Sequence, residues 1–132
     1  MLTPEELMLV SAMEARLSRL AELAEDLGVS LMIDAEHSYF QLAIDRIVLQ
    51  MQRKHNRSVP RIYNTFQCYL TAARPKAAEH MAHADREGWH FAAKVVRGAY
   101  VALERERAGR LGLASPAADS ACHLSPAAPF SL

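Results

Sequence analysis

The stretch His90–Glu104, HFAAKVVRGAYVALE, decides the fold that this sequence predicts. Its first half, residues 91–96, is short, apolar and partly β-branched, which is typical of a strand buried on both faces. Residues 97–100, RGAY, turn the chain out of that strand. A charged helix is expected next, over residues 103–110, so the stretch predicts one strand–turn–helix unit.

Lys94 interrupts the apolar run of this strand. A lysine in a buried strand is costly unless an anion, a dipole or water receives its ammonium group. Cations, a glycine and an aromatic ring at the carboxyl end of a parallel strand are typical of a ligand site in an α/β protein. An ordinary strand with an edge lysine that reaches solvent is the alternative interpretation.

The strand-then-helix pattern occurs twice more upstream. Strands are expected over residues 29–33 and 61–66, with a helix between His37 and Pro60 and another over about residues 75–87. The strands have matching positions at intervals of 31 and 30 residues: Leu31, Ile62 and Ala92. This βα repeat predicts a parallel sheet with right-handed crossovers. Three units do not close an eight-stranded barrel and leave two open strand edges, so we expect part of a larger fold.

A helix precedes the first strand. Thr3 is its expected N-cap, Pro4 its first residue, and Glu6 completes a capping box, while Gly28 ends it. Its apolar residues recur at three- and four-residue steps: Leu7, Val10, Met13, Leu17, Leu20, Ala24 and Leu27. The second helix has its own set of residues expected to face inward: Phe40, Ile44, Ile47, Val48 and Met51. Both patterns predict amphipathic helices.

Composition limits the function classes. The chain has 132 residues with 15 acidic and 15 basic side chains, which predicts one domain and gives no reason to expect nucleic acid as a partner. No apolar run reaches the roughly 18 residues of a membrane span, and the acidic start is unlike a signal or transit peptide. Cys68 and Cys122 are too few for a disulfide framework and are expected to be reduced thiols. His80 and His83 lack further ligands, so we expect a solvated or half-buried helix face and no metal.

The last residues differ from the rest. Residues 113–132 are rich in alanine, serine and proline, with no periodicity. Such a segment buries too little apolar surface to offset its ordering entropy, so a disordered tail is expected. The predicted domain organisation is therefore an α/β domain over residues 1–112 and a low-complexity tail over residues 113–132.

Polar residues follow each predicted strand, where parallel strands converge on one pocket. They comprise acids, amides, cations and a tyrosine: Asp34, Glu36, Asn64, Gln67, Lys94, Arg97 and Tyr100. The set suits an electron-rich heterocycle: Lys94 would stabilise charge that accumulates on a ring during reduction, Gln67 would bind a ring carbonyl or imide, and Tyr100 would cover a small ring. His37 and Ser38 are expected in a surface loop, and residues 104–107 are expected to face solvent.

Three segments resemble a known family: LMIDAEHSYFQLAIDRIVLQMQRKHN, IYNTFQCYL, and REGWHFAAKVVRGAY followed by ERERA. They are similar to the animal, mitochondrial branch of the proline dehydrogenase family over about residues 1–112. The resemblance implies a partial (βα)₈ TIM barrel, in which these strands are the third, fourth and fifth. It also implies FAD as cofactor, L-proline or hydroxyproline as substrate, oxidation of L-proline to Δ1-pyrroline-5-carboxylate, a quinone as electron acceptor, and a mitochondrial location.

The resemblance carries over to individual residues. Asp34 matches the acidic residue of the flavin site, and Gln67 matches the glutamine that binds the isoalloxazine ring. Lys94 matches a cation placed against flavin N5, and residues 96–98 match a segment whose backbone lies along the flavin: Val96, Arg97 and Gly98. Tyr100 matches the tyrosine of the proline pocket, so Lys94 and Tyr100 are the catalytic candidates.

Other parts of the family's site have no match in this sequence, among them the pair of arginines that hold the substrate carboxylate. Two hypotheses follow. The chain is part of an FAD-dependent proline dehydrogenase, or it is a non-catalytic truncated form that acts, if at all, by association with other chains. An unrelated βα-repeat enzyme is a third possibility.

Overall fold

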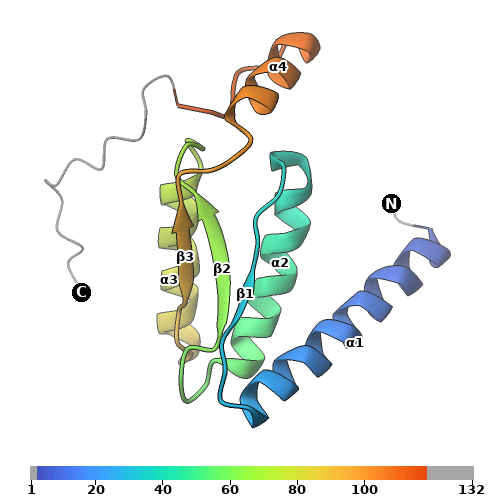
Figure 1. Cartoon of the computed structure of the whole chain (residues 1–132), viewed down its shortest axis with the longest axis vertical. Helices are drawn as coiled ribbons and strands as arrows, with labels where there is room; N and C mark the ends of the chain where they lie inside the picture. The colour runs from blue at the N-terminus through green and yellow to red at the C-terminus, as the bar shows by residue number, and fades with distance from the viewer. Residues whose placement is uncertain (1–2, 119–132) are drawn as a thin grey trace, which may run out of the picture.

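The computed structural model describes residues 3–118. Helices and strands alternate along it in the order that the sequence predicts (Figure 1): α1 (Pro4–Asp26), β1 (Leu31–Ile33), α2 (Ser38–His55), β2 (Ile62–Gln67), α3 (Ala73–Glu87), β3 (Ala93–Val96) and α4 (Val101–Leu111). The predicted capping box is present, because Thr3 N–H donates to the Glu6 carboxylate (2.7 Å) and Glu6 N–H donates to Thr3 Oγ1 (3.2 Å). No helix in this part of the chain has both the length and the hydropathy that crossing a membrane requires.

The strands form one parallel sheet in the order β1-β2-β3. Leu31 pairs with Ile62, and Asn64 pairs with Ala93, so β2 is the central strand. The α/β fold class is confirmed: a helix is followed by three βα units on a parallel sheet, as in part of a (βα)₈ barrel.

The apolar core lies between the sheet and α2. Val48 and Met51 of α2 pack with Ile62 of β2 and with Ala21 of α1, and four partly buried residues surround them: Leu17, Leu31, Ile33 and Ile44. This burial is the main stabilising contribution that the helices make to the sheet.

Two buried polar residues at the carboxyl end of α2, Gln52 and the C-cap residue Asn56, hold the amino ends of β2 and β3. Gln52 Nε2 donates to the carbonyl oxygens of Ile62 (3.0 Å) and Ala92 (2.7 Å). Asn56 Nδ2 donates to the Ile62 carbonyl oxygen (2.9 Å), and Asn56 Oδ1 accepts from Ile62 N–H (2.8 Å). Because these side chains satisfy backbone groups at the strand starts, they set where β2 and β3 begin relative to α2.

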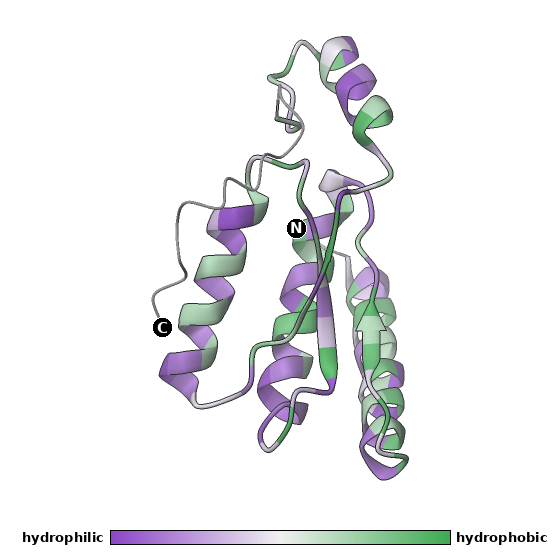
Figure 2. Cartoon of the chain, turned by 60° about the vertical axis from the view of Figure 1, so that its left-hand side comes forward, coloured by the Kyte–Doolittle hydropathy of each residue, from purple (hydrophilic) through white to green (hydrophobic). Residues whose placement is uncertain are grey.

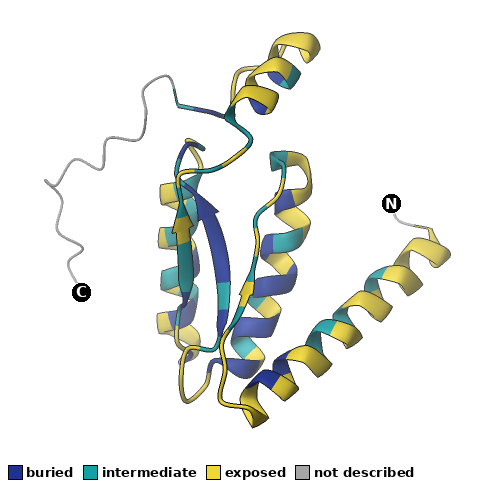
Figure 3. Cartoon of the chain, in the orientation of Figure 1, coloured by how far each residue is buried: buried dark blue, intermediate teal, exposed yellow. Residues whose placement is uncertain are grey.

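The expectation that the strand around Lys94 is buried on both faces is wrong. Val95 is 64% exposed, because β3 is an edge strand that pairs with β2 alone in the described chain. The strand buried along almost its whole length is β2, drawn mostly dark blue in Figure 3. Continuous burial therefore follows from a central position in the sheet and not from the apolar run itself.

Two predicted apolar faces are also less buried than expected. In α1 only Ala21 and Ala24 are buried, whereas Leu20 and the C-cap residue Leu27 are more than half exposed. Phe40, expected to face inward, is 56% exposed. Figure 1 shows the reason for α1: it diverges from α2 toward its amino end, so that only its last turns pack on the core.

The predicted tail is described only in its first six residues. Ala117 is buried beside Leu70, Thr71 N–H donates to the Pro116 carbonyl oxygen (3.0 Å), and Ala118 N–H donates to the Tyr69 carbonyl oxygen (2.8 Å). Residues 113–118 therefore return to the loop that follows β2. Residues 119–132, including Cys122, lie outside the described residues, so the tail and its boundary stay predictions.

Candidate functional site

One hollow lies at the carboxyl ends of the strands, on the sheet face opposite α2 and α3. Alternate residues of β2 point to opposite sides. Asn64 and Phe66 contact the helices, through Asp45 and the His80 ring, whereas Thr65 and Gln67 face the hollow. Its volume is about 310 Å³, and residues from all three βα units line it: Asp34, Ala35, Glu36, Thr65, Gln67, Lys94, Val96, Gly98, Ala99 and Tyr100.

Lys94 faces this hollow and not the helical layer. Its ammonium group forms an ion pair with the carboxylate of Asp34. Thr65 lies beside Lys94 in the sheet register, and its hydroxyl donates to the Ile33 carbonyl oxygen (2.7 Å). The Lys94 and Asp34 side chains are 33% and 74% exposed, so their pair adds little to stability and mainly orients the ammonium group.

Gln67 and Gln41 hold the backbone of Glu36 from two sides. Gln67 Nε2 donates to the Glu36 carbonyl oxygen (2.9 Å), and Glu36 N–H donates to Gln41 Oε1 (3.0 Å). The loop after β1 is thus fixed by one amide from β2 and one from α2. This contact uses one of the two amide N–H groups of Gln67, so its carbonyl oxygen and its second N–H group remain available to a ligand.

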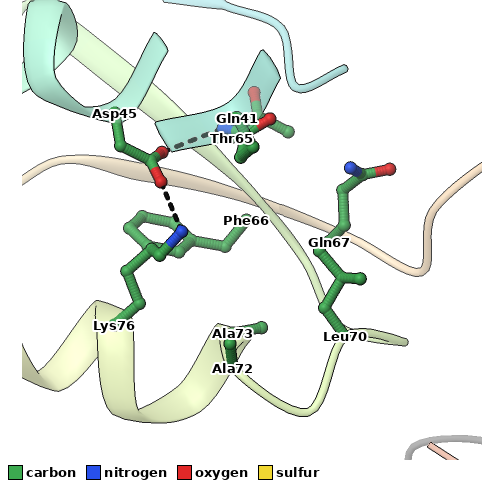
Figure 4. Close-up of a pocket in the computed structure, with 9 residues that line it drawn as sticks. All are labelled: Gln41, Asp45, Thr65, Phe66, Gln67, Leu70, Ala72, Ala73 and Lys76. Atoms are coloured by element: carbon green, nitrogen blue, oxygen red, sulfur yellow. Dashed lines mark hydrogen bonds and ion pairs between the residues drawn. The ribbon is translucent and has the colours of Figure 1, made fainter. Parts of the chain in front are cut away.

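A buried network lies behind this loop, in the helical layer (Figure 4). Asp45 accepts hydrogen bonds from Gln41 Nε2 (2.9 Å), Asn64 Nδ2 (3.0 Å) and Lys76 Nζ (2.6 Å). The cavity beside it measures about 20 Å³, which is room for about one water molecule. Asn64, expected at the convergent pocket, therefore belongs to this network. Sequence reasoning missed Gln41, Asp45 and Lys76, although two polar residues four apart on one helix were a signal.

Gly98 and Tyr69 pack directly against each other at the wall of the hollow. Gly98 has φ +106°, and a Cβ atom there would overlap the Tyr69 ring. Tyr69 is buried, and its hydroxyl group has no hydrogen-bond partner within residues 3–118. Burial, with the charge of Glu104, raises the pKa of Tyr69 to about 12. Only glycine at position 98 lets the backbone lie on this ring.

Arg97 differs from its neighbours in this segment. Its side chain is exposed and does not line the hollow, whereas Val96 and Gly98 do. The carbonyl oxygens of Val96 and Arg97 accept from the N–H groups of Cys68 (2.8 Å) and Tyr69 (3.3 Å). These bonds extend the β2–β3 pairing beyond the strands, so the backbone of residues 96–98 forms an ordered wall.

Tyr100 stands at the start of α4 and reaches back to β1. Its hydroxyl donates to Glu36 Oε2 (3.1 Å), and this contact raises the pKa of Tyr100. Its ring centroid lies 4.3 Å from that of His37. The aromatic ring and the Glu36 carboxylate therefore close one side of the hollow.

Glu104 is buried, contrary to the expectation of a solvent-facing charge run. It accepts hydrogen bonds from Ser38 N–H (2.6 Å) and Ser38 Oγ (2.7 Å), and His37 Nδ1 lies 3.5 Å away. Burial raises the pKa of Glu104, but the Ser38 hydrogen bonds outweigh it and the net pKa is lowered. His37 and Ser38 are thus part of a helix–helix contact and not a free surface loop.

The two histidines of α3 have different environments. His80 is buried against the Phe66 ring, at 5.7 Å between centroids, and burial lowers the pKa of His80. The solvated or half-buried helix face expected for both histidines describes His83, which is partly exposed, but not His80. Residues 3–118 contain no group of three or more side chains placed to bind a metal ion.

Comparison with known proteins shows which family the chain belongs to. The family model described as proline dehydrogenase matches residues 2–123. The chain belongs to the proline dehydrogenase family. The predicted resemblance is therefore confirmed, and the mitochondrial proline dehydrogenase 1 of Homo sapiens is 49% identical over 114 residues, 86% of this chain. The Drosophila melanogaster protein of the same name is 42% identical over 113 residues.

The family relationship extends to the fold. Proline utilization A from Bdellovibrio bacteriovorus, in a crystal structure inactivated by N-propargylglycine, superposes with a TM-score of 0.76 at 18% identity. The match covers 84% of this chain and 12% of that one. The chain spans 19% and 17% of the human and fly relatives, so it corresponds to a limited part of a proline dehydrogenase.

Proposed function

We propose that this chain forms part of the flavin site of a proline dehydrogenase, an FAD-dependent enzyme that oxidises L-proline to Δ1-pyrroline-5-carboxylate. The observation that carries the proposal is the Lys94–Asp34 ion pair, which lies in one hollow with Gln67. By this assignment the three strands are the third to fifth of the barrel. Family membership supports the proposal, since each of these residues lies in a motif that resembles the family's.

The residues present fit the ring system of FAD. The lining of the hollow combines a cation held by a carboxylate, an amide and hydroxyl groups with small apolar residues and the bare backbone of Gly98. Its volume of about 310 Å³ is at the lower end of small-molecule pockets, so it has room for a ring and not for a whole dinucleotide. The nucleotide half would need residues from other parts of a barrel.

Each residue has a distinct proposed role. FAD, when bound, supplies the electron acceptor for hydride transfer from the substrate ring. Lys94, oriented by Asp34, places a fixed positive charge where negative charge develops. Gln67 binds a polar edge of the ring, and the backbone of residues 96–98 lies along it. Tyr100 covers the substrate side.

Substrate, acceptor and compartment complete the proposal. L-proline or hydroxyproline is the substrate, and a quinone accepts the electrons. The mitochondrion is the location, which is also the location in the names of the human and fly relatives. Lys94 and Tyr100 are the catalytic candidates among the described residues.

A second candidate is a non-catalytic role by association with other chains. The exposed edge strands favour it: Met32 of β1 and Val95 of β3 are more than half exposed, and within residues 3–118 each of these strands pairs only with β2. Analytical size exclusion of the purified chain tests this role: self-association without flavin binding would favour it over the first.

Flavin binding tests the principal proposal. The purified full chain is titrated with FAD and followed by flavin fluorescence and visible absorbance, and proline- or hydroxyproline-dependent dye reduction is then measured. Lys94→Ala is expected to weaken FAD binding, whereas Lys54→Ala, which removes an exposed lysine paired with Glu22, is expected to leave it unchanged. A colourless chain with no FAD affinity would refute the proposal.

A further inference from the structure

The contact between α4 and α2 is centred on a single carboxylate. Glu104 is 1% exposed, and both of its oxygens accept hydrogen bonds from Ser38. The cation–π contact of Arg107 with Tyr39, at 4.7 Å, joins the same two helices. Figure 1 shows α4 extending beyond the carboxyl end of the sheet.

Glu104 acts as a cap for α2 from outside that helix. The N-cap residue of α2, His37, makes no side-chain capping hydrogen bond. The first backbone N–H groups of a helix lack partners within it and carry partial positive charge. Ser38 N–H, at the first position of α2, donates to Glu104 instead. A buried anion and a helix amino end therefore stabilise each other.

The same carboxylate lies one helical turn from the hollow. Glu104 N–H donates to the Tyr100 carbonyl oxygen (2.9 Å), and Tyr100 lines the hollow and donates to Glu36. The His37 ring contacts both: its Nδ1 lies 3.5 Å from the Glu104 carboxylate, and the ring is tilted against the Tyr100 ring at 4.3 Å between centroids. A displacement of Glu104 would thus be transmitted to Tyr100 along α4 and through His37.

We propose that Glu104 is a positioning residue of this site: by capping α2 it fixes α4 and holds Tyr100 over the hollow. The part of this inference that concerns FAD rests on the proposed function, whereas the placement of Tyr100 does not. Figure 2 shows that the first residues of α4, next to Tyr100, are hydrophobic, whereas the middle of the helix, which contains Glu104, is hydrophilic.

A purely structural cap is the competing explanation, and the position of Tyr100 distinguishes the two. The full chain is prepared with ¹³C-labelled tyrosine, whose four ring signals are assigned by Tyr→Phe substitution, and with ¹⁵N label for the Ser38 amide. The variants are Glu104→Ala, Glu104→Gln and Ser38→Ala. Glu106→Gln is the matched control, because Glu106 is exposed on the same helix. FAD affinity is measured for each.

Glu104→Ala is expected to shift the ring signals of Tyr100 and the Ser38 amide together and to weaken FAD binding about tenfold, as expected for loss of a charged hydrogen-bond acceptor. Glu104→Gln and Ser38→Ala are expected to shift the same signals less, and they replace Glu104→Ala if it fails to fold. Glu106→Gln is expected to change neither. A shifted Ser38 amide with an unchanged Tyr100 ring would overturn the inference. If the wild-type chain binds no FAD, the proposed function fails, and the Tyr100 signal still decides the role of Glu104.

Discussion

Asp34 and Lys94 form an ion pair across a strand that separates them. Asp34 follows β1 and Lys94 lies in β3, with β2 between them, and the pair passes over Thr65. Strands two places apart are about 10 Å apart, so only a side chain as long as lysine can span the gap from one to the other. The pair therefore connects the end of β1 with β3 across the central strand, at the position where the hollow begins.

Breaking this exposed pair is expected to cost little stability. Lys94→Met should change the free energy of unfolding by no more than about 1 kcal/mol, because both side chains remain hydrated. Urea unfolding followed by circular dichroism measures this. A loss of about 3 kcal/mol would mean that the pair is a structural element, and Lys94 would then be a poor candidate for a ligand contact.

The second lysine–aspartate pair, Lys76 with Asp45, is expected instead to contribute strongly to the free energy of unfolding. Asp45 is buried and accepts from Lys76 as well as from two amides. Asp45→Ala should lower the free energy of unfolding by about 3–5 kcal/mol, because it leaves buried donors without an acceptor. Asp85→Ala, at an exposed position of α3, is the control and should be nearly neutral. Equal losses for both variants in urea unfolding would contradict the importance of the network.

Substituting the glycine at the wall of the hollow should disrupt packing. Gly98→Ala introduces a Cβ atom that overlaps the Tyr69 ring at a positive φ, so a loss of about 2 kcal/mol or more is expected. Gly109→Ala, in open space within α4, should instead gain about 0.5–1 kcal/mol. Tm measurements compare the two. If Gly98→Ala is as stable as wild type, Tyr69 does not pack as described.

The contact between Arg53 of α2 and Glu87 of α3 predicts that the stability of the fold depends on pH. Hydrogen bonds from Arg53, at 2.6 and 2.7 Å, and from Trp89 lower the pKa of Glu87 to about 2. A carboxyl group with a lowered pKa in the folded state stabilises it fully above its unfolded pKa of about 4.5. This stability is lost as the pH falls from there through about 2.

The test compares wild type with Glu87→Gln. The wild type should be the more stable at pH 7, and the difference should shrink below pH 4.5 and vanish near pH 2. The fluorescence of Trp89, the single tryptophan, follows unfolding at each pH. A difference that does not change between pH 7 and pH 2 would exclude the Glu87 charge as its source.

Most of the fold could be predicted because its signals are local. The capping box at Thr3, the glycine that ends α3 and the repeat of strand openings each depend on residues a few positions apart. The site was predicted in part for the same reason: Asp34, Gln67 and Lys94 come directly at or after strands, and parallel strands bring their carboxyl ends together. The structure places all three at one hollow. Their binding of a flavin stays a prediction.

The sequence by itself determined the order of the βα units, the start of α1, the glycine that ends α3 and the edge of the sheet where polar residues gather, because short-range periodicity and turn chemistry encode them. Only the tertiary structure decided that Asn64 faces the helices, that Glu104 is buried and that Val95 is exposed. The physical reason is that each of these depends on which element lies opposite. A strand's burial needs neighbours on both sides, and a charge can be buried only where a distant helix end supplies its partner.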